Sequence, residues 1–168
     1  MVEHPIAERL VPSLLDRLTD DNPFQQVEAR DARVVGSVNL RRSIQRDLEW
    51  LFNTTHLGSD INLDGLPEVK SSVLNFGIPD LGALTNKSVE DIETILREAI
   101  ANFEPRIIED TLVVSVVEPN KPRRANRLDF QIEGKLWSQP LPQALYLRTE
   151  FDLDVNAVQI AKPRQRGS

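Results

Sequence analysis

The apolar residues in the first part of the chain recur at the spacing of amphipathic helices. Between residues 6 and 19 the leucines keep this spacing, but Pro12 interrupts it, so the pattern predicts a short helix that begins near Pro12. A second apolar stripe runs from Leu40 to Asn53, and Trp50 and Phe52 widen it. The two stripes predict two helices joined by an irregular connection.

A third helical stripe fills residues 89–103 and is the most continuous of the three. Ser88 and Asp91 form a pair similar to a capping box at its start, with Asp in place of the usual Glu or Gln. Pro105 disfavours helical geometry in the residue before it, so the helix is predicted to end near Phe103 or Glu104. Residues 54–87, between the second and third helices, contain glycines and prolines that predict mostly loop.

Beyond Pro105 the apolar residues follow the period of β-strands. Residues 106–117 are rich in Ile and Val, and residues 128–133 alternate strictly between apolar and polar side chains. Residues 147–155 alternate in the same way, with Thr149 on the apolar side. Short connections between consecutive strands favour antiparallel pairing. We therefore predict an α+β fold in which about three helices pack on one face of a small, mainly antiparallel sheet of three to four strands.

Such a sheet has two edges unless other elements cover them. The backbone N–H and C=O groups of an uncovered edge are available to a strand from another chain. Strand addition by a protein partner is therefore a feature to look for in the structure.

The composition narrows the functional classes. The 168 residues include no cysteine, which excludes disulfides, thiolate metal sites and iron–sulfur clusters. The net charge of -6 argues against nucleic-acid binding, so we interpret the local basic clusters as solvated charge. The first 30 residues contain no continuous apolar stretch of the kind found in a signal peptide or a membrane span. These features predict a cytoplasmic protein that does not insert into a membrane.

The sequence contains few groups arranged for catalysis. His4 and His56 belong to no metal or triad motif, and no glycine-rich phosphate loop is present. We therefore predict no metal, no cofactor and no small-molecule substrate. A glycosidase needs two facing carboxylates, and the candidates in this sequence are Glu104, Glu109, Asp110 and Asp80. Nothing in the sequence brings two of them to one cleft, so we predict no catalytic residues.

Glu104, Pro105 and Arg106 lie where the third helix meets the first predicted strand. Proline fixes the chain direction there, and a positioned arginine can form a bidentate pair with a carboxylate of a protein partner. Alternatively, Glu104 and Arg106 decorate the helix end or pair within the fold. The spacing alone favours neither interpretation.

Several motifs occur in an order that resembles a known family. They are PSLLDRLTDDNP near the N-terminus, SIQRDLEWLFNT at 43–54, SSVLNFGIPDL at 71–81, FEPR at 103–106 and LRTEFDLD at 147–154. Together they resemble TssE, the small baseplate subunit of bacterial type VI secretion systems, a family related to the gene 25 wedge protein of contractile phage tails. The resemblance spans most of the chain but is weaker in the first 35 residues and in the tail.

The resemblance implies a structural subunit of a baseplate docked at the inner membrane. Its partners are then other wedge subunits, bound through Glu104, Pro105 and Arg106, and sheath subunits, whose first ring is templated by strand addition at a sheet edge. The domain plan is an N-terminal arm at 1–35, a wedge domain at 36–161 and a basic tail at 162–168. The family also has a lysozyme-related label, so the alternative function is a peptidoglycan hydrolase that uses paired carboxylates.

Overall fold

The computed structural model describes residues 13–19, 37–84, 86–117, 127–137, 142–152, 155 and 157–161. The helices in these ranges are α1 Leu14–Leu18, α2 Ser37–Phe52, α3 Pro67–Lys70, α4 Leu81–Leu84 and α5 Val89–Phe103. The strands are β1 Val113–Val116, β2 Arg127–Leu136, β3 Gln143–Asp152 and β4 Ala157–Ala161. Short 3-10 turns lie at Leu57–Ser59, Val73–Asn75 and Glu109–Thr111.

The four strands form one sheet in the order β1-β2-β3-β4, and every neighbouring pair is antiparallel. The α+β class and the antiparallel pairing are therefore confirmed. The third predicted strand ends at Asp152, and Val155, which was assigned to its apolar side, lies exposed in a turn. A fourth strand follows this turn and pairs with β3, with Ile160 opposite Thr149.

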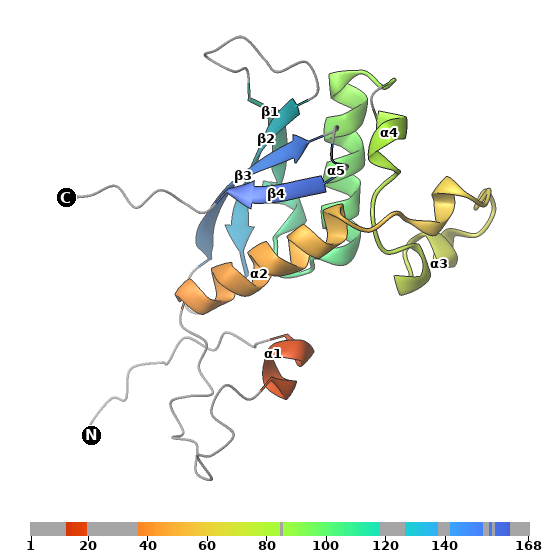
Figure 1. The fold of residues 1–168 in the computed structure, drawn as a ribbon. Coiled ribbons are helices and arrows are strands. Elements are labelled where there is room, and N and C mark those ends of the chain that lie inside the picture. The colour runs from red at the N-terminus through yellow and green to blue at the C-terminus, as the bar shows by residue number, and fades with distance from the viewer. Residues whose placement is uncertain are drawn as a thin grey trace, which may run out of the picture.

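The helices α2 and α5 lie side by side on one face of the sheet, α2 beside β4 and α5 beside β1 (Figure 1). Their apolar stripes are the ones predicted from the sequence, and they bury the inner sides of the strands. The largest fully buried side chains are Phe52, Phe130, Phe151, Ile44, Leu48, Leu51, Ile78, Leu84, Leu96, Ile100, Ile132 and Leu136. Phe151 contacts both Phe52 of α2 and Phe130 of β2, so the core joins helix to sheet.

The capping of α5 agrees with the sequence. The Ser88 side chain accepts a hydrogen bond from the backbone N–H of Asp91, and the helix ends at Phe103 with Glu104 as its C-cap. This helix therefore delivers the backbone to Pro105 at a defined position.

The short helix α1 takes no part in the core. Ser13 caps it, and its first described helical residue is Leu14. Leu14 and Leu18 are 70% and 75% exposed, and an ion pair of 2.7 Å joins Asp16 to Arg46 of α2. Two long helices, rather than three helices, cover the sheet.

Two other sequence predictions need correction. Trp50, assigned to the apolar stripe of α2, is 52% exposed, and the guanidinium of Arg46 stacks over its ring at 5.2 Å from the centroid. The strand predicted from residue 106 begins only at Val113. Before that point Ile107 forms an isolated bridge with Leu136, and the turn at Glu109–Thr111 interrupts regular pairing.

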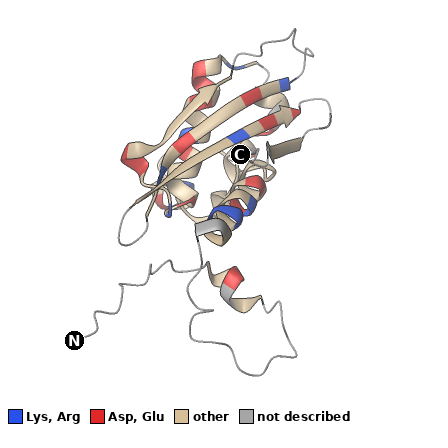
Figure 2. Ribbon diagram, turned by 90° about the vertical axis from the view of Figure 1, so that its left-hand side faces the viewer, with Lys and Arg blue, Asp and Glu red and all other residues tan. Residues whose placement is uncertain are grey.

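The outer face of the sheet carries charges of both signs along its strands (Figure 2). Arg127 pairs with Asp152 at 2.9 Å, and Arg148 pairs with Asp129 at 2.9 Å. These exposed pairs make the outer face polar. Among the described helices, none combines the length and the apolar character that crossing a membrane requires.

The predicted division into an arm, a wedge domain and a tail remains a prediction. Of the arm at 1–35 only residues 13–19 are described, and the tail at 162–168 lies outside the described residues, as does His4.

Candidate functional site

The Glu104-Pro105-Arg106 corner connects α5 to the sheet through backbone hydrogen bonds. The N–H of Glu104 closes the last turn of α5 on the C=O of Ile100 at 2.8 Å. The N–H of Trp137, at the end of β2, donates to the C=O of Arg106 at 2.8 Å. Both sides of Pro105 are therefore fixed, and Pro105 itself is exposed.

Glu104 and Arg106 pair with each other across the proline. Arg106 Nε lies 2.6 Å from Glu104 Oε1, and Arg106 Nη2 lies 2.5 Å from Glu104 Oε2. This is the bidentate arrangement that a guanidinium and a carboxylate favour. Glu104 is only 3% exposed. Of the interpretations left open by the sequence, pairing within the fold is therefore what the structure contains.

Two residues of α2 complete the surroundings of Arg106. Its Nη1 donates to Ser43 Oγ at 3.1 Å, and its Nη2 donates to Asp47 Oδ2 at 2.6 Å. Burial alone would lower the pKa of Arg106, but the bonds and charge of Glu104 and then of Asp47 raise it above the ordinary value. The corner thus holds a permanent positive charge against α2.

The ion pairs continue from the corner to α1. Asp47 also pairs with Arg46 at 2.8 Å, and Arg46 pairs with Asp16 at 2.7 Å. The charges of Glu104, Arg106, Asp47, Arg46 and Asp16 therefore alternate in sign along one connected network. We call these five residues the corner network.

The edge of the sheet at β4 is closed by side-chain amides of α2. The register with β3 directs the backbone groups of Val158 and Ile160 outward. Asn53 Nδ2 donates to the C=O of Val158 at 2.9 Å, and Asn53 Oδ1 accepts from its N–H at 2.9 Å. Gln45 Nε2 donates to the C=O of Ile160 at 3.1 Å.

At the opposite edge, β1, one side-chain hydrogen bond from the described residues reaches the backbone. The N–H of Val117 donates to β2, so the outward backbone groups of this strand belong to Val114 and Val116. Glu93 Oε1 of α5 accepts from the N–H of Val116 at 2.7 Å. No other described residue bonds to the outward groups of these two valines. The two edges therefore differ.

The sequence reasoning missed Asn53, Gln45 and Glu93. Asn53 follows the apolar stripe of α2 directly, and an amide side chain at a helix end that packs on a sheet is the signal that could have found it. For Glu93 the sequence offers no such signal, because its partner lies 23 residues later in a strand whose edge position appears only in the structure.

The SSVLNFGIPDL segment at residues 71–81 belongs to the long connection between α2 and α5, and it contacts the end of each of these helices. Ile78 pairs with Thr55 beyond the end of α2, and Phe76 contacts Phe103 of α5 at 5.4 Å between ring centroids. Gly77 has φ +127, and a Cβ at this position would lie 2.2 Å from the carbonyl oxygen of Thr54. Glycine is therefore required here.

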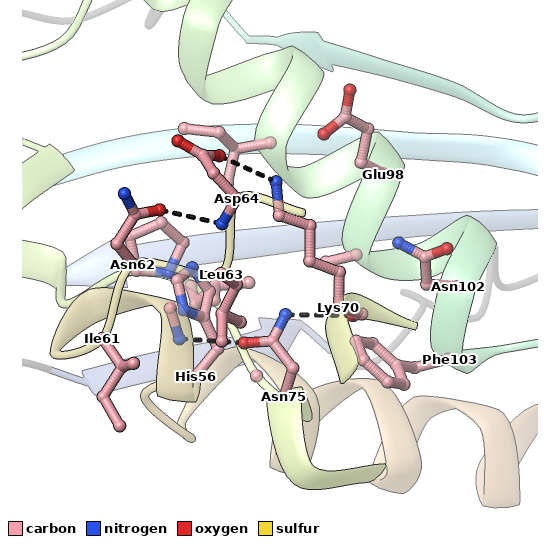
Figure 3. Close-up of a pocket in the computed structure, with 16 residues that line it drawn as sticks. His56, Ile61, Asn62, Leu63, Asp64, Lys70, Asn75, Glu98, Asn102 and Phe103 are labelled. Carbon is pink, nitrogen blue, oxygen red and sulfur yellow. Dashed lines mark hydrogen bonds and ion pairs between the residues drawn. The ribbon is translucent and has the colours of Figure 1, made fainter. Parts of the chain in front are cut away.

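A cavity of about 340 Å³ lies between this loop and α5, as Figure 3 shows. Asn75 lines this cavity. Its side chain accepts a hydrogen bond from the N–H of Gly58 and donates one to the C=O of Lys70. Lys70 also pairs with Asp64 at 3.4 Å. His56 lines the cavity, and its Nδ1 is buried without a hydrogen-bond partner among the described residues.

The four candidate carboxylates do not gather at this cavity, since none of them is among its lining residues. Both oxygens of Glu104 accept from Arg106, and Asp80 Oδ1 accepts from the N–H of Gly82. Glu109 and Asp110 are exposed on the 3-10 turn before β1. In the described ranges there is no group of three or more His, Cys, Asp or Glu side chains that could hold a metal ion.

The comparison with known families agrees with the resemblance to the gene 25 wedge protein family that the sequence motifs indicated. The family model described as baseplate wedge protein gp25 matches residues 38–141, which include α2 from its second residue, α5, the corner and the first two strands. No curated protein and no solved structure matches the chain. The chain therefore belongs to the family of the baseplate wedge protein gp25, whose role in the baseplate is structural.

Proposed function

We propose that the chain is a non-enzymatic subunit of a type VI secretion baseplate wedge, and that it binds other wedge subunits through the Glu104-Pro105-Arg106 corner. The observation that carries the proposal is the rigid, exposed proline held between two paired charges. A surface that keeps its shape before binding loses little conformational entropy when a partner docks.

The corner network supports this role because it fixes the position of the Arg106 guanidinium and still leaves one of its N–H groups for a partner. A guanidinium has five N–H groups. Four of those on Arg106 donate to Glu104, Asp47 and Ser43. The fifth, on Nη1, has no partner among the described residues, and the Arg106 side chain is 20% exposed. A backbone or side-chain oxygen of a wedge partner can accept from this group while Pro105 packs against an apolar surface.

The test uses Pro105→Ala, because this exposed side chain can be changed without removing a member of the corner network. The variant is co-expressed with the candidate wedge subunits and the complex is purified. We expect roughly tenfold weaker association, equivalent to about 1.4 kcal/mol, and a loss of stability of less than about 1 kcal/mol from the greater freedom of the unfolded chain. The matched control is Arg97→Ala, an exposed residue of α5 away from the corner. Equal recovery of wedge subunits by both variants would count against docking at the corner.

We propose further that a sheet edge templates the first ring of the contractile sheath by accepting strands from sheath subunits. The sheet supports this because its inner face is buried by α2 and α5, whereas its edge strands β1 and β4 have no neighbouring strand among the described residues. Under this proposal the subunit works in the cytoplasm, in a baseplate docked at the inner membrane.

The absence of catalysis is part of the proposal. Glu104 is the most buried of the four candidate carboxylates, and an internal ion pair engages both of its oxygens. A general acid must instead present a proton to the leaving oxygen of a sugar. A turbidity assay with purified peptidoglycan tests the alternative. Robust lysis that one carboxylate-to-amide substitution abolishes would replace this proposal with the hydrolase.

A further inference from the structure

The two edges of the sheet offer different numbers of backbone groups to an incoming strand. At β4, the N–H and C=O of Val158 and the C=O of Ile160 are bonded to Asn53 and Gln45. At β1, the N–H of Val116 is bonded to Glu93, and no other outward group has a partner among the described residues. Each edge directs two residues outward, so described residues occupy three of four outward groups at β4 and one of four at β1.

The amide of Asn53 bonds to β4 as an added strand would. A residue in a neighbouring strand offers one N–H and one C=O to the residue opposite, and Asn53 offers the equivalent pair to Val158. Asn53 Nδ2 also donates to the C=O of Glu49 in the last turn of α2, which fixes the amide in place. Because Leu48, Leu51 and Phe52 anchor this part of α2 in the core, the amide cannot withdraw with its helix without opening the core.

The hydrogen bond between Glu93 and the N–H of Val116 at β1 breaks when the Glu93 side chain alone changes its conformation. Glu93 reaches Val116 through a flexible side chain, whereas α5 is held by Ile92, Leu96 and Ile100. Rotation of the Glu93 side chain therefore exposes the N–H of Val116 and leaves the packing of α5 intact. Val113, on the outer face of the same strand, is 55% exposed and offers apolar surface that an added strand would cover.

We propose that β1 is the edge that receives a strand from a neighbouring chain, that Asn53 and Gln45 close β4 with three hydrogen bonds, and that Glu93 is a displaceable cap on β1. This proposal rests on the strand addition proposed above. It adds which edge of the sheet is used and which side chain regulates access to that edge. The occupant is an extended segment of a sheath subunit, paired with the outward groups of Val114 and Val116. In the free subunit Glu93 keeps this edge from pairing with other chains.

The test uses the absence of cysteine from the sequence. Ser115→Cys and Gln159→Cys each place one thiol on the outer face of an edge strand, at β1 and β4 respectively. Each thiol is labelled with a maleimide-linked benzophenone, and the protein is mixed with the cognate sheath subunits and irradiated. We expect crosslinks from position 115 and not from position 159. Adding Glu93→Ala should raise the affinity for sheath subunits roughly fivefold, because a competing hydrogen bond is removed.

The outcomes separate the two proposals. Crosslinks from position 159 alone would overturn the choice of β1 and leave strand addition intact. A complex that forms without crosslinks from either position would overturn strand addition together with the choice of edge. If Glu93→Ala binds sheath subunits no better than the unsubstituted protein, while position 115 still crosslinks, the role of Glu93 as a cap is wrong.

Discussion

Arg106 Nη2 lies 2.6 Å from Asp47 Oδ2, so the corner that follows α5 is tied to the middle of α2. The same Asp47 pairs with Arg46, which in turn pairs with Asp16 of α1. One carboxylate of α2 therefore stands between the corner and the N-terminal arm. Changes at the corner are expected to act on stability as well as on docking.

Arg106→Ala should destabilise the fold. The substitution leaves the buried carboxylate of Glu104 without its partner, and an unpaired buried charge is strongly unfavourable. We expect a loss of about 3 kcal/mol in the free energy of unfolding, measured by urea denaturation. Failure of this variant to join the wedge would then not by itself demonstrate a docking role.

Arg106→Lys distinguishes the contribution of the positive charge at this position from that of the planar guanidinium. Lysine keeps the positive charge but cannot reproduce the planar fork that bonds both oxygens of Glu104. We expect a loss of stability between that of the unsubstituted protein and that of Arg106→Ala. If Arg106→Ala unfolds at the same urea concentration as the unsubstituted protein, the corner network contributes nothing to stability.

Asn53→Ala should weaken the attachment of α2 to β4. It removes both hydrogen bonds to Val158, each worth about 1 kcal/mol net, and should lower the free energy of unfolding by about 2 kcal/mol. Amide hydrogen exchange provides the local measurement, since the N–H of Val158 should exchange faster. Asn53→Asp is the control that retains the acceptor for this N–H. Unchanged exchange at Val158 in Asn53→Ala would show that Asn53 does not close this edge.

The docking of α1 should depend on pH through Asp16. Burial raises the pKa of this carboxyl, but hydrogen bonds from Ser13 and Arg46 outweigh burial and lower it below its ordinary value of 3.8. Because the folded-state pKa is lowered, the stabilisation is present above pH 3.8 and is lost as the pH falls through the folded-state value. The effect should be within about 1 kcal/mol, since the pair is partly exposed.

Trp50 can report this change, because Arg46 joins Asp16 to the indole ring. The chain has two tryptophans, so Trp137→Phe leaves Trp50 as the sole source of indole fluorescence. We expect a step in Trp50 emission below pH 3.8 that is absent when Asp16→Asn is added. Identical titrations with and without Asp16→Asn would contradict the prediction.

Leu96→Asp should abolish the fold. Leu96 is 0% exposed in the centre of the α5 stripe, where a charge has no partner and no water. We expect loss of the cooperative thermal transition. The milder Leu96→Ala should retain the transition and lose about 3 kcal/mol of stability. The adjacent exposed residue provides the control, since Arg97→Ala should melt as the unsubstituted protein does.

The sequence predicted the features that depend on neighbouring residues. The stripe of α5, the Ser88 cap and the end of the helix before Pro105 are all encoded within one segment, and each appears in the structure. The alternation in β2 and β3 likewise identified their buried faces. The prediction of three to four strands is met by the sheet, but β4 was not placed, because its few residues follow the end of β3 after one turn.

The features that depend on distant residues were not predicted. The sequence left open whether Glu104 and Arg106 meet a partner or pair within the fold. Arg106 bonds to Ser43 and Asp47, which lie 63 and 59 positions earlier, and Glu104 is buried beside it. The closure of β4 by Asn53 joins residues 105 positions apart. Trp50 falls on a helical stripe by spacing, yet its side chain is 52% exposed.

A three-dimensional reconstruction of the baseplate wedge assembled with this subunit tests the central claim, which is that the chain works by binding other proteins at the corner and at a sheet edge. We expect density from another wedge subunit against Pro105 and Arg106, and an extended segment of a sheath subunit along the sheet. A reconstruction in which this corner faces solvent and no chain pairs with the sheet would contradict the account.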